Sequence, residues 1–132
     1  MNKIEAILKE ARENKWPYPK MFESLKNAGV RSNSVSFING FESIFEGDFG
    51  VWQAPTFEGY VRPVLSDAFS EEGIKTAILE RAQRKISYMQ LLAALAAQGI
   101  SHYKADMTNN TVTYFNEDED RFYEQAVPVW KE

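Results

Sequence analysis

The sequence has 132 residues, a length typical of one domain, so we expect residues 1–132 to fold around a single core. Hydrophobic residues make up 44% of the chain and charged residues 26%, which favours a globular fold over disorder. The lack of cysteine excludes disulfides and thiolate metal ligands, and a net charge of −4 argues against general binding to nucleic acid or anionic membranes.

The first predicted helix begins after Asn2, whose side chain can cap it. An apolar stripe on this helix consists of Ile4, Ile7, Leu8 and Ala11. The segment Trp16–Pro19 ends the helix, because each of its two prolines disfavours the helical conformation of the residue before it. Proline suits the first turn of a helix, so a second helix is predicted from Pro19 to a stop at Gly29.

The segment Val30–Phe45 is predicted as a β-hairpin that turns at Asn39-Gly40, a strong hairpin signal. A two-residue turn there would pair Val35 with Ile44. The same register places a glutamate on the apolar face, so the pattern supports it less well than it supports the second hairpin below. The following segment, residues 48–65, is rich in glycine, proline and aromatic residues and is predicted as a crossing loop with a short strand near its start.

A third helix is predicted over Glu71–Lys85, with Ser70 as its N-cap. Its core-facing residues are expected to be Ile74, Ala77, Ile78 and Ala82. The fourth helix begins with Ser87 and Gln90, which have the spacing of a capping box. It ends at Gly99, because glycine can take the left-handed conformation that closes a helix.

A second hairpin follows the fourth helix, with Asn109-Asn110 as a two-residue turn. This turn would pair Met107 with Val112 and gather apolar side chains on one face. The acidic segment Asn116–Asp120 lacks the spacing of a calcium-binding loop and favours a soluble turn that protects a sheet edge. A closing strand is predicted over Arg121–Val127, at an edge or ending there, because the proline after it has no N–H to donate.

The two hairpins belong to similar units. Placing Phe22–Phe45 over Leu92–Phe115 without gaps aligns Gly29 with Gly99 and one hairpin turn with the other. Either an internal duplication or a chance likeness between two helix–glycine–hairpin units explains this alignment. All the elements together predict an α+β fold, in which these units form antiparallel sheet packed by about four helices.

The second half contains a series of short motifs: Lys85-Ile86-Ser87-Tyr88, Ala96–Ile100, Tyr103–Asp106, Thr111–Phe115 and Tyr123–Pro128. Their types and spacings resemble the YbcV-like family (DUF1398) of small bacterial and phage-associated proteins. The resemblance covers roughly residues 20–128, which makes the helix within residues 1–16 a possible appendage. It implies no established activity. Family members tend to carry a tryptophan near Tyr103 and a cysteine near Thr113, and this chain has neither.

His102 is the only histidine. It is predicted on the outer face of the second hairpin, where acid–base chemistry would need neighbours that tune its pKa and where an ordinary solvated strand face is the simpler interpretation. Ser101 is not expected to cooperate with it, because successive residues of a strand point to opposite faces. No catalytic, phosphate-binding or metal-binding motif occurs, so neither a cofactor nor a metal is expected.

Aromatic residues in loops are the better clue to a site, since such residues either line a pocket or interface or simply cover the core. A pocket, where one forms, is predicted between the 48–65 loop and the hairpins. Its candidate binding residues are Trp52, Tyr60, Arg62 and His102.

We favour a non-enzymatic module that binds a protein partner or itself, because catalytic motifs are missing and antiparallel strands leave edges available. The alternative is a small-molecule-binding protein or an enzyme that uses the predicted pocket. A third alternative is nucleic-acid binding through Arg81, Arg84 and Lys85, although cations near a helix end also suit its dipole. No membrane partner is expected. The polar N-terminal residues and the lack of a long apolar run predict a cytoplasmic protein.

Overall fold

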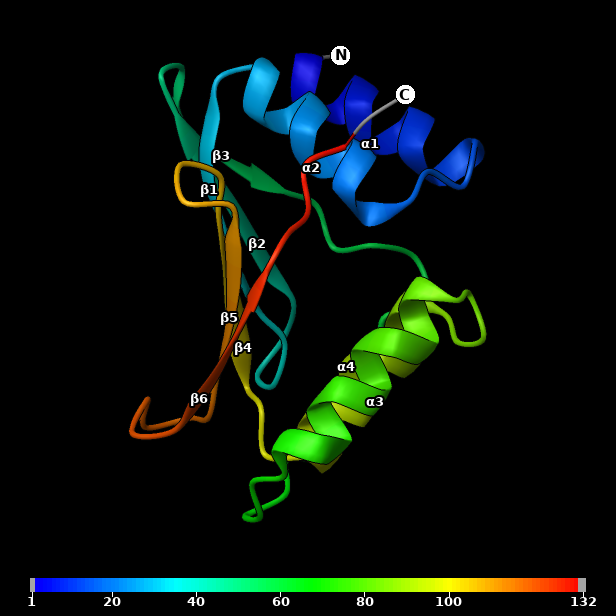
Figure 1. Ribbon diagram of the computed structural model, residues 1–132, viewed down its shortest axis with the longest axis vertical. Coiled ribbons are helices and arrows are strands. Elements are labelled where there is room, and N and C mark those ends of the chain that lie inside the picture. Colours follow the sequence, from blue (N-terminus) through cyan, green and yellow to red (C-terminus); the bar gives the residue numbers. More distant parts are fainter. Residues whose placement is uncertain (1, 131–132) are drawn as a thin grey trace.

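The computed structural model describes residues 2–130 and shows the predicted α+β fold (Figure 1). The helices are α1 (Lys3–Glu13), α2 (Tyr18–Asn27), α3 (Glu71–Ala82) and α4 (Tyr88–Ala97). The strands are β1 (Val30–Ser36), β2 (Glu42–Gly47), β3 (Gly50–Ala54), β4 (His102–Asp106), β5 (Thr111–Phe115) and β6 (Phe122–Ala126).

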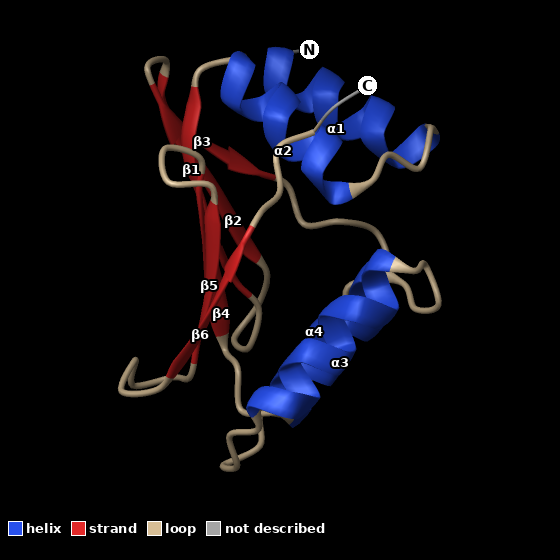
Figure 2. Ribbon diagram, in the orientation of Figure 1, coloured by secondary structure: helices blue, strands red, loops and turns tan. Residues whose placement is uncertain are grey.

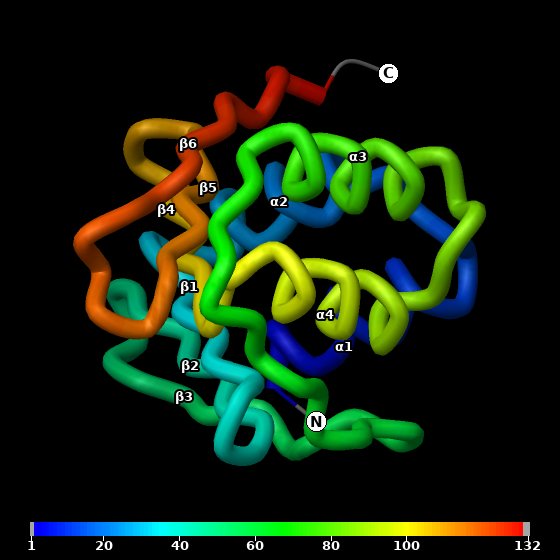
Figure 3. Tube along the Cα trace, turned by 90° about the horizontal axis from the view of Figure 1, so that it is seen from below, coloured from blue at the N-terminus to red at the C-terminus, as the bar shows by residue number. Residues whose placement is uncertain are grey.

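All six strands form one antiparallel sheet in the order β3-β2-β1-β4-β5-β6. Two three-stranded meanders therefore meet at the central pair β1–β4, and β3 and β6 are the two edges. The pairs α1–α2 and α3–α4 lie on one face of this sheet (Figures 2 and 3). Among the elements that the structure describes, the opposite face carries no helix. None of the helices within residues 2–130 is long and apolar enough to cross a membrane.

Local signals set several of the helix ends as predicted. The side chain of Asn2 accepts a hydrogen bond from the backbone N–H of Glu5 (2.7 Å), and that of Ser87 accepts one from Gln90 (3.1 Å), so both caps are confirmed. Gly99 has a positive φ of 91°, as its predicted role as a helix stop requires.

The third helix is shorter than predicted. It starts after the N-cap Ser70 but ends at Ala82, short of Lys85. Arg84 has a φ of 58°, and a residue in the left-handed region cannot continue a right-handed helix. Ala82 consequently lies in the last turn and is exposed, so its predicted place in the core is wrong.

The predicted register of the second hairpin is wrong by two residues. Ala105, not Met107, pairs with Val112, and residues 107–110 form a four-residue loop. The loop closes early because the carboxylate of Asp106 accepts hydrogen bonds from the backbone N–H groups of the residues that follow it, at 2.9 and 3.1 Å. A two-residue shift preserves the alternation of faces, so the predicted apolar face still points to the core.

The first hairpin is shifted by a single residue, which does exchange the faces. Val35 pairs with Ser43 rather than Ile44, and the connection is the five-residue loop Phe37–Phe41. The Asn39-Gly40 signal lies inside this wider loop. The shift turns Phe45 into the core, where it is 3% exposed, and moves Glu42 off the core face, where the predicted register had placed it.

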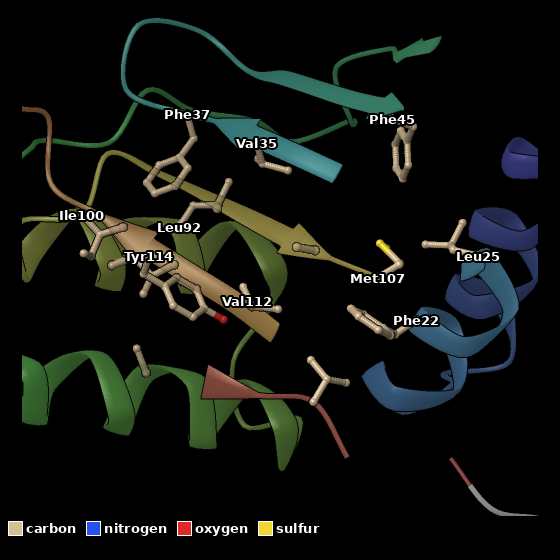
Figure 4. Close-up of a cluster of buried hydrophobic side chains, with 14 of the residues drawn as sticks. Phe22, Leu25, Val35, Phe37, Phe45, Leu92, Ile100, Met107, Val112 and Tyr114 are labelled. Atoms are coloured by element: carbon tan, nitrogen blue, oxygen red, sulfur yellow. The ribbon is translucent and has the colours of Figure 1, made fainter. Parts of the chain in front are cut away.

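The hydrophobic core fills the space between the sheet and the helix layer (Figure 4). Its largest fully buried side chains are Phe22, Phe37, Leu25, Ile74, Leu92, Leu95, Ile100, Met107, Val30 and Val35. The helix pairs are also joined to each other, because the Arg84 guanidinium donates to the backbone carbonyls of Lys15 and Trp16 at the end of α1. This member of the predicted basic cluster therefore has a structural contact.

Candidate functional site

Three of the four predicted site residues hold the fold in place. Trp52, on β3, packs its ring against Phe45 with 5.6 Å between the ring centroids. Tyr60 donates its hydroxyl to the Phe37 carbonyl oxygen (2.7 Å), and Arg62 donates its Nε to the Ile38 carbonyl oxygen (2.9 Å). Tyr60 and Arg62 thus hold the β1–β2 loop by hydrogen bonds to its backbone. These bonds satisfy two carbonyl oxygens that would otherwise bond to water.

His102 lies on the open face of the sheet with both ring nitrogens in contact. Its Nδ1 is 2.6 Å from the Ser101 hydroxyl, its Nε2 is 3.1 Å from a carboxylate oxygen of Glu119, and its ring stacks on Phe115. The expectation that Ser101 could not meet His102 is wrong. Ser101 precedes β4, so the alternation of side chains along a strand does not yet apply to it.

An open depression of about 390 Å³ lies beside His102. Its lining comes from the β1–β2 loop, the start of β4 and the β5–β6 turn: Ser36, Ile38, Asn39, Gly40, Phe41, Glu42, Ser101, His102 and Glu117. The structure therefore brings His102 next to the loop that Tyr60 and Arg62 hold. Trp52, Tyr60 and Arg62 are not part of this lining, and neither is any other residue of the 48–65 segment. No group of three or more potential metal-ligating residues gathers anywhere in the described part of the chain.

Two tyrosine hydroxyls meet on the core side of the sheet, Tyr88 with Tyr103 at 2.6 Å. Burial raises the pKa of the Tyr88 hydroxyl to about 12, and burial likewise raises the pKa of Tyr103 well above its ordinary value. Both hydroxyls stay protonated at neutral pH. The hydrogen bond between them therefore links α4 to β4.

The edge strand β6 presents backbone groups to solvent at alternate residues. A hydrogen bond from the Val127 N–H to the Asn110 carbonyl oxygen (2.8 Å) fixes which residues face β5. The backbone groups of Phe122, Glu124 and Ala126 therefore point away from the sheet.

Charge and proline protect this β6 edge. The acidic turn before it includes Glu117 and Asp118, and both Arg121 and Glu124 are exposed. Pro128 continues the alternation of the outward-facing residues and has no N–H that an added strand could bond to. These are the devices by which natural sheets discourage pairing with another chain.

The opposite edge, β3, has its own outward groups. The Asp48 N–H donates to the Gly29 carbonyl oxygen (3.2 Å), so alternate residues of β2 turn toward β1 and those between them turn toward β3. The backbone groups of Gly50, Trp52 and Ala54 consequently form hydrogen bonds to β2. The N–H and C=O groups of Val51 and Gln53 face outward with no strand beyond them.

The β3 strand itself carries no charged residue that would protect it. The stretch Phe49–Pro55 contains no charged residue, Val51 is 69% exposed and Phe49 is 48% exposed. Only Pro55 limits the edge, at its far end. An uncharged, exposed edge strand is a template for pairing with another strand. Sequence reasoning did not single out this edge, although the uncharged run was visible, because it could not place β3 at the border of the sheet.

The fold defines a class of small α+β proteins, with a six-stranded antiparallel sheet, helix pairs on one face and two unequal edges. The chain belongs to the DUF1398 family, described as "Protein of unknown function", whose model matches residues 7–125. It is similar to uncharacterised proteins of Mycobacterium bovis and Mycobacterium tuberculosis, at 27% identity over 128 residues. That alignment covers 95% of this chain and 74% of each relative. The predicted family is confirmed and its relatives are bacterial, whereas the phage association stays a prediction.

Proposed function

We propose that the protein is a non-enzymatic interaction module that binds an extended polypeptide segment by strand addition at β3. The bare β3 edge carries this proposal. Val51 and Gln53 each offer an outward N–H and C=O, and no charge within β3 repels an incoming backbone.

The energetics suit a reversible interaction. Each backbone hydrogen bond to an added strand contributes a net of about 0.5–1.5 kcal/mol. Val51, a largely exposed apolar side chain, adds the burial of its surface when a partner strand lies beside it. The charged β6 edge makes a second partner on the other side of the sheet unfavourable, so the module has one binding edge.

Selection from a library of random extended peptides displayed on phage tests the proposal. We expect enrichment of uncharged, β-branched and aromatic peptides whose binding falls by about tenfold or more with Val51→Lys, because a cation then occupies the edge. Phe122→Lys is the matched control, since it makes a similar change at an exposed position of β6 and should leave binding intact. The proposal fails when no peptide is enriched, or when Val51→Lys binds the selected peptides as well as the wild type does.

The depression beside His102 favours a second candidate, small-molecule binding. The polar groups of Ser101, His102 and Glu119 form a hydrogen-bonded chain at its border, and polar groups that converge near a concavity are typical of ligand sites. Nuclear magnetic resonance with a library of small polar compounds tests this candidate. It predicts shifts in the signals of His102 and Asn39, and shifts scattered over the surface would argue against it.

A further inference from the structure

We infer that the strand which completes the sheet is β3 of a second copy of this chain. The inference rests on the proposed function, namely that β3 accepts a strand, and it names the partner. A strand that pairs antiparallel with its own copy must be compatible with its own sequence in reverse.

The β3 sequence meets this requirement. Antiparallel pairing centred on Trp52 places Val51 opposite Gln53 of the second copy, and Gln53 opposite Val51 of the second copy. Both outward residues of each strand then exchange backbone hydrogen bonds. No charged residue lies opposite another anywhere along the pair, because the stretch Phe49–Pro55 is uncharged.

In the proposed dimer the side chains of β3 continue both faces of the sheet, the one that faces the core and the open one. On the core side Trp52, which packs on Phe45, would meet Trp52 of the second copy, and aromatic pairs across strands are stabilising. On the open side Val51 would be covered by its neighbour from the second copy instead of remaining 69% exposed. Pro55 and the turn before Gly50 then end the pairing at both sides.

The other edge does not satisfy the same requirement. The three outward residues of β6 are centred on Glu124, so self-pairing through all of them puts one Glu124 opposite the other. Pairing of β3 with β6 of another copy would leave free edges and grow into a filament, and the charges around β6 oppose it. The remaining arrangement is a closed two-fold dimer with one continuous sheet.

Sedimentation velocity across micromolar to millimolar concentrations tests the inference. We expect the wild type to approach twice the monomer mass of 15.2 kDa as concentration rises. Val51→Lys should raise the dissociation constant by about tenfold or more, whereas the matched Phe122→Lys should leave it unchanged. Both positions are exposed, so circular dichroism should show the native fold in each variant.

The outcomes separate the two proposals. A wild type that stays monomeric but binds selected peptides in a Val51-dependent way overturns the dimer and leaves strand addition standing. A monomer that also binds no peptide overturns both. A dimer that persists unchanged in Val51→Lys shows that the interface lies elsewhere and overturns the inference.

Cysteine pairing then tests the register, since the chain has no cysteine of its own. Under mild oxidation a mixture of the Val51→Cys and Gln53→Cys proteins should form a cross-linked dimer of one copy of each. Either variant alone should cross-link much more slowly, because each residue faces the other position in the partner copy. Rapid cross-linking of Val51→Cys alone would overturn the register centred on Trp52.

Discussion

The two halves of the sheet share one plan and differ in how they complete it. Strands β1, β2 and β3 form one meander and β4, β5 and β6 the other. The ungapped alignment of Phe22–Phe45 with Leu92–Phe115 matches Ser34 with Lys104, and in the sheet these two residues are direct partners in the central β1–β4 pair. A two-fold rotation about this pair therefore relates the two central strands. The duplication itself stays a prediction.

The halves diverge at their hairpin loops. The first loop has one residue more than the second, so Phe45 points to the core whereas its aligned counterpart Phe115 lies on the open face beside His102. Because side chains alternate along a strand, one extra residue is enough to exchange the faces of everything that follows in that half. The two edges also differ in sequence, because β3 lies in an uncharged stretch whereas β6 carries Glu124.

The largest effect should come from this exchange of faces. Phe45→Ala should lower the free energy of unfolding by about 3–5 kcal/mol, because Phe45 is 3% exposed and its loss leaves a cavity. Phe115→Ala should cost only about 1 kcal/mol, the loss of a stacked contact on the open face. Urea unfolding followed by circular dichroism measures both. Equal losses would mean that the first hairpin has the register predicted from sequence, with Phe45 on the open side.

The second-largest effect should be a difference in stability between alanine substitutions at the two helix stops, Gly99 and Gly29. A methyl group on Gly99 would overlap the carbonyl oxygen of Ala68, whereas one on Gly29 would have its nearest neighbour at 3.8 Å, in Asp48. Both glycines have positive φ, so either alanine variant carries a backbone cost of about 1–2 kcal/mol.

Gly99→Ala should therefore lose about 3 kcal/mol or more in total and Gly29→Ala about 1–2 kcal/mol, since only the first must also displace backbone. Thermal unfolding of the two variants in parallel gives the comparison. A smaller loss for Gly99→Ala would show that the segment before α3 moves aside at little cost.

What could be predicted from the sequence depended on distance along the chain. The caps at Asn2 and Ser87 and the stop at Gly99 were predicted correctly, because each acts on backbone within a few residues. The hairpin registers were wrong because Phe45, with Glu42, and Asp106 decide them. In the first hairpin, burial of Phe45 and exclusion of Glu42 from the core outweigh the turn signal, and in the second a carboxylate that a turn pattern does not include closes the loop early.

The candidate site was less predictable for the same reason. Loop aromatics were expected either to line a pocket or to cover the core, and only the path of the loop shows that Tyr60 and Arg62 fasten the β1–β2 loop. The uncharged run in β3 was present in the sequence. Its meaning depends on the central β1–β4 pairing, which joins segments far apart in the chain and leaves β3 at the border.

The smallest effects should distinguish the two hairpin loops. The first loop is held from outside by Tyr60, and the second holds itself through Asp106. Slight burial opposes ionisation of Asp106, but hydrogen bonds from Asn109 and Thr108 outweigh it and keep its pKa below the ordinary value. A carboxyl with a lowered pKa in the folded state adds stability above its unfolded pKa of about 3.9, and that stability disappears as pH falls through the lowered value.

Asp106→Asn should therefore cost about 0.5–1 kcal/mol at neutral pH, allowing for screening by solvent, and this difference from the wild type should shrink as pH falls below about 4. Tyr60→Phe is the matched variant for the first loop. It removes a hydroxyl–carbonyl bond of about the same net worth, and its cost should not change over that range because no carboxylate takes part. Urea midpoints measured across acidic to neutral pH show which behaviour each loop follows. A cost of Asp106→Asn that stays constant with pH would mean that its charge contributes nothing and that the loop shape alone sets the second register.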